Sequence, residues 1–365
     1  MNFTKKQTIL LGMSGGVDSS VAALLLKQRG YKVIGAFMKN FSDTKNKLTG
    51  ECAWVEERKS AQKIAAILNI PLITLDYEDE YKKHVIDPMF RDYKKGITPN
   101  PDILCNTLIK FPFLWKAAKE NEASLIATGH YARIKKTKQG FQLLQGKDKH
   151  KDQSYFLSDL SQFDLEHTLF PLGNLTKEQV RAVAKKHKFP NWNKLGTRGI
   201  CFVGKQDMQQ FLKQRIKEKF GKVISSEGSV LGTHKGVSYY TIGQKVGEHI
   251  GIVIKKPRGF EGTRFYVASK NIKKNELIVA PEGHPALLAK TVSLKKFHQV
   301  NPQEKAPARL NARIRHLGNL QKGTLTKRGS IYRFTFKKPQ AALAPGQRLV
   351  FYKGRQLIAS AEIKL

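Results

Sequence analysis

The stretch Ser14-Gly15-Gly16-Val17-Asp18-Ser19 lies between an apolar run, residues 9–13, and a helix-forming run, residues 21–26. This order predicts a β-strand, a tight turn and the start of an α-helix. Such a turn directs backbone N–H groups and the positive end of the helix dipole at one point, which suits an anion such as phosphate. The two glycines let the backbone approach a ligand closely, and the serine hydroxyls add donors. The turn therefore predicts a phosphate site.

The chemistry expected of this turn follows from its composition. It contains no lysine and does not fit the GxxxxGK[ST] spacing of kinase-type nucleotide loops. We therefore interpret it as a loop that holds pyrophosphate rather than one that transfers a γ-phosphoryl group. The alternative is an ordinary turn in which Asp18 or Ser19 caps the helix. The SGGxDS string resembles the PP-loop of ATP pyrophosphatases, which split ATP into AMP and pyrophosphate while they adenylate a substrate.

The first third of the chain alternates strand-like and helical runs. The strand-like runs are residues 8–13, 32–38, 71–76 and 124–128, and the helical runs are residues 19–29, 54–68 and 103–121. Such alternation predicts a doubly wound α/β domain with a parallel sheet. Ligands bind beyond the carboxyl ends of the strands in such sheets. We therefore expect the opening loop, Met38 and the Gly129-His130 turn to converge on one crevice.

The pattern changes after about residue 205. A helix is predicted for residues 207–220, followed by short β-like runs at residues 228–236, 239–247 and 264–267. The last part alternates apolar and polar residues in short runs, which predicts a small antiparallel barrel or sandwich. We place the domains at residues 1–205 (catalytic), 206–285 (small, β-containing) and 286–365 (basic β-barrel).

Charge indicates the partner. The 365 residues include 65 Lys and Arg against 29 Asp and Glu, a formal net charge of +36. From residue 286 onward, 17 basic residues face only Glu304 and Glu362. A general lysine bias would spread the charge evenly, so the clustering favours nucleic-acid binding. No apolar stretch approaches the roughly 20 residues of a membrane span. The first strand leaves no room for a leader, so we expect a cytoplasmic monomer that binds no membrane.

The three cysteines lie far apart, which argues against a zinc finger or a dithiol motif. Cys105 follows a rigid Pro-containing loop and falls three residues into a predicted helix capped by Asp102, where the dipole favours thiolate. Asp102 could take a proton; the alternative is a capped helix with a half-buried thiol. Cys201 has glycine neighbours, and Arg198 could lower its pKa; the alternative is a core cysteine in a short strand. Cys52 receives no role.

Several strings together resemble the tRNA-specific 2-thiouridylase family over nearly the full length. They are GMSGGVDSS (12–20), GxTPNPDxLCNxxIKF (96–111), ATGHYAR (127–133), GKDKxKDQSYFL (146–157), GICFVG (199–204), YTIGQ (240–244) and APGQ…VFY (344–352). The chain departs from the family at Thr107-Leu108, where a charged pair is usual, and at residues 245–248, after GQ. Two alternatives are another ligating ATP pyrophosphatase and an RNA-binding protein with a relic nucleotide fold. The two cysteines argue against the former and the intact loop against the latter.

The resemblance implies ATP-dependent 2-thiolation of the wobble uridine of tRNA. ATP, with Mg²⁺, would lie on Gly12, Met13, Ser14, Gly15, Gly16, Val17, Asp18, Ser19, Met38 and Gly129. The uridine C2 oxygen would attack the α-phosphate. Cys201 would carry a persulfide, Cys105 would act as nucleophile, and a Cys105–Cys201 disulfide would form. Asp102 would assist proton transfer.

The resemblance also implies the contacts with tRNA. Asn100, Pro101 and Asp102 would meet a flipped target base, as chemistry on a stacked base requires. Further tRNA contacts would come from His130, Lys151, Asp152, Gln153, Arg315, His316 and Gln347. The expected partners are tRNAs of the Lys, Glu and Gln type and a sulfur-donor protein, either a cysteine desulfurase or a relay protein.

Overall fold

The computed structural model describes residues 7–42, 52–194, 208–304 and 306–364. Its first part contains the predicted parallel sheet, in the order β3-β2-β1-β4-β7. The strands are β1 (Thr8–Gly12), β2 (Lys32–Lys39), β3 (Leu72–Asp76), β4 (Leu125–Ala127) and β7 (Thr168–Leu169). All four pairings are parallel, so the prediction of a doubly wound sheet is confirmed.

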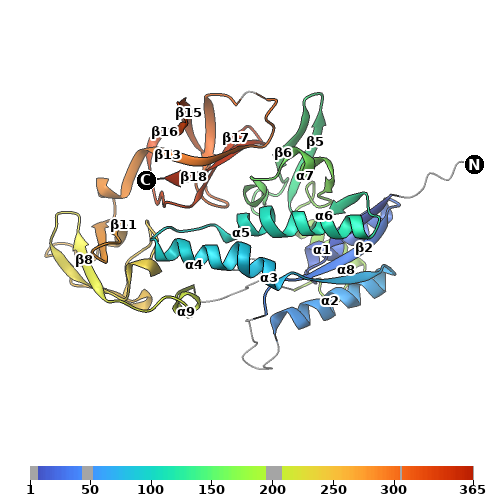
Figure 1. The fold of residues 1–365 in the computed structure, drawn as a ribbon, viewed down its shortest axis with the longest axis horizontal. Coiled ribbons are helices and arrows are strands. Elements are labelled where there is room, and N and C mark those ends of the chain that lie inside the picture. The colour runs from blue at the N-terminus through green and yellow to red at the C-terminus, as the bar shows by residue number, and fades with distance from the viewer. Residues whose placement is uncertain (1–6, 43–51, 195–207, 305, 365) are drawn as a thin grey trace, which may run out of the picture.

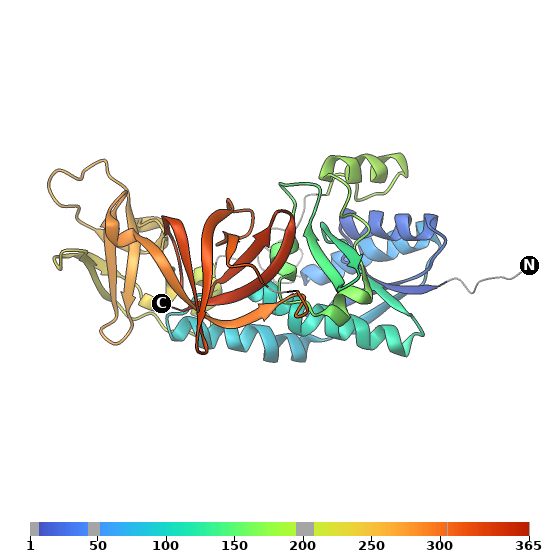
Figure 2. The ribbon, with the colours of Figure 1, turned by 90° about the horizontal axis from the view of Figure 1, so that it is seen from above.

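Two helical layers cover this sheet because its strands are apolar on both faces. Ile9 and Leu11 pack with α1 (Val17–Gln28), α2 (Ala53–Leu68) and α8 (Lys177–Lys186). Leu10 points the other way, as the twofold side-chain period of a strand requires. It packs into a second core that includes α6 (Phe111–Glu120). Figure 2 shows α4 (Asp87–Lys94, cyan) and α6 (teal) one after the other along the lower edge of the molecule.

The helix predicted for residues 103–121 is interrupted. Residues Pro101–Leu104 form α5, Cys105–Lys110 form a π-helical segment, and α6 follows. The same order occurs earlier, where α3 (Glu78–Tyr81) and a π segment (Lys82–Ile86) precede α4. In both cases a proline, Pro88 or Pro112, stands two residues after the π segment. Proline removes a helical N–H and crowds the carbonyl four residues earlier, which explains the widened turn.

The central part forms a second sheet in the order β10-β9-β8-β12-β11. Its elements are α9 (Met208–Lys213), β8 (Gly221–Ser225), β9 (Val230–His234), β10 (Ile252–Ile254), β11 (Phe265–Asn271) and β12 (Glu276–Pro281). The helix predicted to reach residue 220 ends at Lys213, because Ile216 turns into the core and its carbonyl accepts the Tyr239 hydroxyl. The strand predicted at 239–247 is wrong: the segment turns at Gly243 (φ +84°) and forms no strand. It hydrogen-bonds to β11 through the backbone of Gly243, Gln244 and Val246, and Lys245 makes an isolated bridge to Tyr266.

The last part is the predicted antiparallel barrel. Its strands are β13 (Leu288–Gln299), β14 (Arg309–Arg313), β15 (Gln321–Arg328), β16 (Ile331–Ala341), β17 (Arg348–Lys353) and β18 (Gln356–Lys364). The order β13-β16-β15-β14-β17-β18 closes through a β13–β18 pairing. Sequence reasoning missed a hairpin, β5 (Ala132–Thr137) and β6 (Gly140–Gln145), which extends the barrel sheet from the N-terminal part by pairing with β18.

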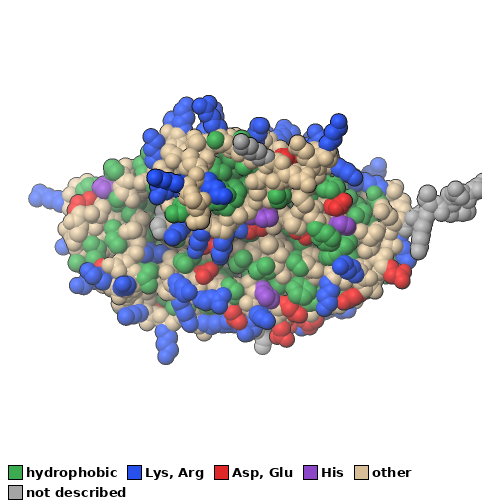
Figure 3. All heavy atoms as spheres, turned by 45° about the horizontal axis from the view of Figure 1, so that its top comes forward, with side chains coloured by type: hydrophobic (Ala, Val, Ile, Leu, Met, Phe, Trp, Pro, Cys, Tyr) green, Lys and Arg blue, Asp and Glu red, His purple; other side chains and the backbone are tan. Residues whose placement is uncertain are grey.

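The barrel lies over the middle of the molecule, between the parallel sheet and the central sheet (Figures 1 and 2). Two short helices, α7 (Gln162–Glu166) and α8, complete the N-terminal part. Figure 3 shows a hollow across one face, with Lys and Arg side chains on both of its sides. Among the described residues, no helix has the length and apolar character needed to cross a membrane.

Candidate active site

The opening loop leaves the start of α1 without a side-chain cap. Gly16 is the N-cap residue, with φ −83° and ψ 159°, and within the described part of the chain no side chain bonds the first-turn N–H groups of α1. The alternative in which Asp18 or Ser19 caps the helix is therefore wrong. The Ser19 hydroxyl instead donates to the Gly16 carbonyl at 3.0 Å and accepts from the Ser14 N–H at 3.3 Å. An uncapped helix start with two nearby serines is the arrangement that an anion fills.

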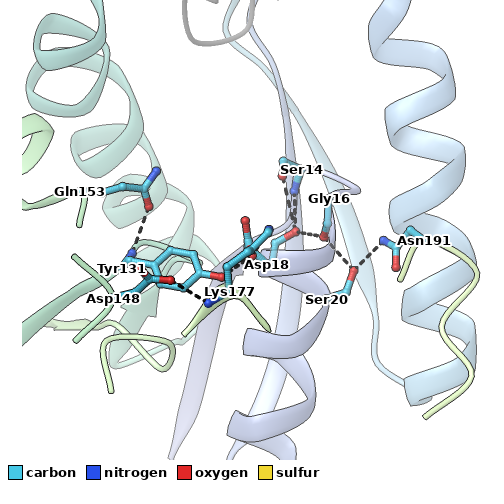
Figure 4. Close-up of polar contacts among 10 residues, drawn as sticks. Ser14, Gly16, Asp18, Ser20, Tyr131, Asp148, Gln153, Lys177 and Asn191 are labelled. Carbon is cyan, nitrogen blue, oxygen red and sulfur yellow. Dashed lines mark hydrogen bonds and ion pairs between the residues drawn. The ribbon is translucent and has the colours of Figure 1, made fainter. Parts of the chain in front are cut away.

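Gly15 holds the loop against the neighbouring helix. Its φ is +72°, and a Cβ there would lie well inside 3.0 Å of the Glu57 carbonyl oxygen in α2. The Gly15 carbonyl accepts from the Ser60 hydroxyl at 2.8 Å and from the Asn191 amide at 3.0 Å. Figure 4 shows Asn191 reaching Ser20 as well, at 3.0 Å. Sequence reasoning missed Ser60 and Asn191, because no local pattern links them to the loop.

Asp18 is the loop's acidic residue, and two donors hold it (Figure 4). Its Oδ1 accepts from the Tyr131 hydroxyl at 2.7 Å and from the Lys177 ammonium at 2.6 Å. Burial, followed by the Asp18 charge, raises the pKa of Tyr131, so the phenol keeps its proton and donates it to the carboxylate. Tyr131 lies in the ATGHYAR string, and Lys177 begins α8.

The structure brings the predicted crevice residues together. A Cβ on Gly129 would lie 3.0 Å from the Ser19 nitrogen, so the Gly129-His130 turn packs on the start of α1. Met38 is 6% exposed and lies two residues after Ala36 in β2, and the Ala36 carbonyl accepts the Met13 N–H at 2.8 Å. The carboxyl ends of β1, β2 and β4 thus meet at the loop, as the sheet topology requires.

His130 is buried beside this crevice. Its Nδ1 lies 2.7 Å from the Thr128 hydroxyl, and its ring stacks on Phe111. Burial, and secondarily the Lys110 charge, holds the pKa of His130 well below its usual value. The imidazole is therefore neutral at physiological pH, and a contact with tRNA stays a prediction for a neutral ring.

The predicted target-base loop is capped differently from expectation. Asn100, not Asp102, caps α5: its side-chain oxygen accepts the Ile103 N–H at 3.2 Å, and Pro101 takes the first helical position. Asp102 therefore lies inside the helix and is partly exposed. Cys105 is 0% exposed within an apolar cluster, whereas the capped-helix alternative expected a half-buried thiol.

The barrel holds the same loop in place. The Gln347 side-chain nitrogen donates to the carbonyls of Thr98 and Pro99 at 3.2 and 3.0 Å, and its oxygen accepts from Asn100 at 3.4 Å. The Thr98 N–H donates to the Pro345 carbonyl at 2.9 Å. Gln347 thus joins the barrel to the loop that precedes Cys105. Its contact with tRNA stays a prediction.

The KDQSYFL string makes polar contacts between the N-terminal part and the barrel. Asp152 is 1% exposed and accepts from Arg313 at 2.7 Å and from the N–H groups of Gly146 and Ser154 at 3.1 Å. Lys151 is exposed, and the Gln153 oxygen accepts the Tyr131 N–H at 3.0 Å. Lys151 is therefore open to a polyanion, while the contacts predicted between tRNA and Asp152 or Gln153 stay predictions.

Arg315 and His316 lie on the barrel side of the same region. Arg315 is exposed and lines a cavity of about 640 Å³ together with Gln347, Tyr239 and Gln244. The His316 ring lies 4.2 Å from that of Phe156, and its Nδ1 is buried without a partner among the described residues. Burial lowers the pKa of His316 to about 4, so the ring is neutral at physiological pH.

Two predicted features cannot be placed in this site. Cys201 lies outside the described residues, and its predicted meeting with Cys105 stays a prediction. Among the described residues, no group of three or more His, Cys, Asp or Glu side chains could hold a metal ion.

Three family models match consecutive parts of the chain. The first, described as a tRNA methyl transferase HUP domain, matches residues 7–205. The second, a tRNA methyl transferase PRC-barrel domain, matches residues 209–281, and the third, an aminomethyltransferase beta-barrel domain, matches residues 289–363. The first model alone covers more than half of the chain.

Curated relatives match almost the whole chain. The tRNA-specific 2-thiouridylase MnmA 1 of Geobacillus kaustophilus is 42% identical over 362 residues, which cover 98% of this chain and 96% of that protein. MnmA of Pseudomonas fluorescens strain Pf-5 is 41% identical over 364 residues, covering 99% and 95%. A solved NMN synthetase from Francisella tularensis has a TM-score of 0.35 at 18% identity, covering 57% of this chain and 74% of that one, too low to support an argument.

Proposed function

The chain belongs to the tRNA-specific 2-thiouridylase family, and from this premise we propose that it replaces the C2 oxygen of the wobble uridine of tRNA with sulfur at the expense of ATP. The observation that carries the ATP-dependent half is the uncapped start of α1 with its two serine hydroxyls. A polyphosphate satisfies the open N–H groups and the helix dipole together. We assign ATP to residues 12–19, with Met38 and Gly129 beside it.

The first step activates the base. The uridine C2 oxygen attacks the α-phosphorus, the bond to the bridging oxygen breaks, and pyrophosphate leaves. The carbonyl oxygen thereby becomes part of an AMP leaving group. Asp102, partly exposed one helical turn from Cys105, takes the uridine N3 proton or returns it. Mg²⁺ bound to the phosphates of ATP would neutralise part of the charge of the leaving pyrophosphate.

The second step brings the sulfur. A donor protein, a cysteine desulfurase or a relay protein, loads Cys201 as a persulfide. The terminal sulfur adds to C2 and AMP leaves; Cys105 thiolate attacks the Cys201 sulfur, which frees 2-thiouridine and leaves a Cys105–Cys201 disulfide. A thiol reductant must then return both cysteines to thiols. Because Cys105 is 0% exposed, the side chains covering it have to move when the base and persulfide enter.

The tRNA binds across the hollowed face that carries Lys and Arg side chains on both sides of the hollow (Figure 3). Asn100, Pro101 and Asp102 are partly exposed beside the buried Cys105, so a base extruded from its stack reaches them first. The net charge of +36 favours the phosphate backbone, so binding weakens steeply with salt. We propose tRNAs of the Lys, Glu and Gln type as substrates, a monomeric enzyme and a cytoplasmic location.

The test is to incubate unmodified tRNA with ATP, Mg²⁺ and a persulfide donor and to analyse the nucleosides. We expect 2-thiouridine at the wobble position, its loss in Cys201→Ser, and its retention in the matched control Cys52→Ser. Absence of 2-thiouridine from the wild-type reaction would refute the proposal. Two of the matched models are described in terms of methyl transfer, and a methylated nucleoside formed with a methyl donor would favour that reaction instead.

A further inference from the structure

A cation that contacts the nucleotide loop comes from a distant part of the chain. The Lys177 ammonium lies 2.6 Å from Asp18 Oδ1, and its side chain is 14% exposed. The loop itself contains no lysine. An unneutralised Asp18 in the first turn of α1 would repel a polyphosphate that binds there. Lys177 removes this repulsion while keeping its charge within reach of the loop.

A second cationic residue lies on the same helix, α8. Arg181 is four residues after Lys177, so both side chains lie on one face of α8. Arg181 Nε is buried without a hydrogen-bond partner among the described residues. Its charge opposes the rise in the pKa of Tyr131 that burial and Asp18 produce, which places it near that phenol. A buried unpaired donor is costly, so a ligand that accepts from it would gain binding energy.

The start of α8 is fixed rigidly at this point. Thr176 and Gln179 form a capping box, and the Lys177 N–H donates to the Asp148 carboxylate at 2.9 Å. Val180 and Ala184 are buried in the core that α1 shares. Among the described residues, the Lys177 ammonium has a single acceptor, Asp18, although an ammonium carries three donors. The helix therefore presents a positioned cation with unused donors to the loop.

We propose that Lys177, supported by Arg181, forms the second half of the polyphosphate site and binds the β- and γ-phosphates of ATP and then the leaving pyrophosphate. This inference rests on the ATP site of the proposed function. Negative charge develops on the bridging oxygen of pyrophosphate as its bond to the α-phosphorus breaks. A positioned ammonium stabilises that charge, and does so more in the transition state than in bound ATP. Lys177 thus supplies what a loop lysine supplies in kinase-type loops.

Binding of three ligands separates this role from a structural one. In Lys177→Gln, α,β-methylene-ATP and inorganic pyrophosphate should bind about 10- to 100-fold more weakly in calorimetry, as expected for a lost charge-assisted hydrogen bond. AMP should bind as in the wild type, because it lacks the β- and γ-phosphates. Arg181→Met should weaken pyrophosphate binding in the same direction, and Lys177→Arg should restore part of it. Lys186→Gln, an exposed residue of the same helix, is the matched control.

Each outcome decides the question. Equal weakening of AMP and pyrophosphate, or no change in either, would overturn the proposal. If Lys177→Gln fails to fold, Asp18→Asn/Lys177→Gln removes both charges of the pair, and the same ligand comparison applies. A wild-type chain that binds neither α,β-methylene-ATP nor pyrophosphate would refute the ATP site itself, a result distinct from selective failure of the Lys177 variants.

Discussion

Two adjacent glycines of the nucleotide loop should respond to alanine in opposite ways. Gly15 has φ +72°, and a Cβ there would overlap the Glu57 carbonyl. The same added Cβ would lie 3.2 Å from the Ser60 Cβ. Gly16 has φ −83° and ψ 159°, which alanine adopts freely, and its nearest neighbour to an added Cβ is the Ser14 hydroxyl at 3.5 Å. Gly15→Ala is therefore a folding variant and Gly16→Ala a binding variant.

The magnitudes follow from this geometry. A left-handed alanine costs roughly 1–2 kcal/mol, and displacing the α2 backbone to relieve the overlap costs about 1–3 kcal/mol more. We therefore expect Gly15→Ala to lower the free energy of unfolding by about 2–5 kcal/mol. In Gly16→Ala the loss should be at most about 1 kcal/mol, the typical difference between a good N-cap residue and alanine. The added methyl group lies inside the loop, so ATP affinity should fall at least about tenfold.

Urea unfolding followed by circular dichroism measures the first effect, and calorimetric titration with α,β-methylene-ATP measures the second. The two variants share composition and differ by one position, so each is the control for the other. A Gly15→Ala protein as stable as the wild type would refute the packing argument. A Gly16→Ala protein that binds the nucleotide normally would show that the phosphates do not lie in this loop.

Three further predictions concern the barrel and its joints. Asp152→Ala should lower the free energy of unfolding in urea by about 3–5 kcal/mol, because it leaves the buried Arg313 charge without its partner. Asp152→Ala/Arg313→Met should recover much of this loss. A single variant as stable as the wild type would contradict the burial of the pair. Gln347→Ala should lower kcat/KM for tRNA thiolation about 10- to 100-fold through three lost hydrogen bonds, while nucleotide affinity stays unchanged. Equal losses in kcat/KM and in nucleotide affinity would argue against a role confined to the target-base loop. The pKa of His316 is lowered to about 4, so its ring binds a proton more readily in the unfolded chain, and stability should fall as pH drops from about 6.5 towards 4. His316→Gln should make this fall smaller. An unchanged pH profile in that variant would exclude His316 as its source.

The sequence predicted the parts of the site that local chemistry specifies. The strand, glycine turn and helix around Ser14 to Ser19 follow from a short pattern, and the topology of a parallel sheet then brings Met38 and Gly129 beside it. Asn100 rather than Asp102 caps α5 because Pro101 already has the backbone angle of a first helical residue. A proline at position 101 therefore indicates that the residue before it, Asn100, is the N-cap.

The remaining residues depend on tertiary packing. Ser60, Lys177 and Asn191 reach the loop from 45, 159 and 176 residues away, and no local pattern connects them with it. The burial of Cys105 is likewise set by helices that pack around it, so the helix-start position alone suggested too much exposure. The hairpin at residues 132–145 carried an alternating pattern, but its pairing with β18 joins segments more than 200 residues apart.

In the proposed reaction the uridine C2 oxygen leaves as part of AMP. This step is tested most directly with tRNA that carries ¹⁸O at C2 of the wobble uridine, incubated with ATP, Mg²⁺ and a persulfide donor. Mass spectrometry of the products then follows the label. We expect one ¹⁸O in AMP for each 2-thiouridine formed and none in pyrophosphate. Label in water or in pyrophosphate, with unlabelled AMP, would contradict it.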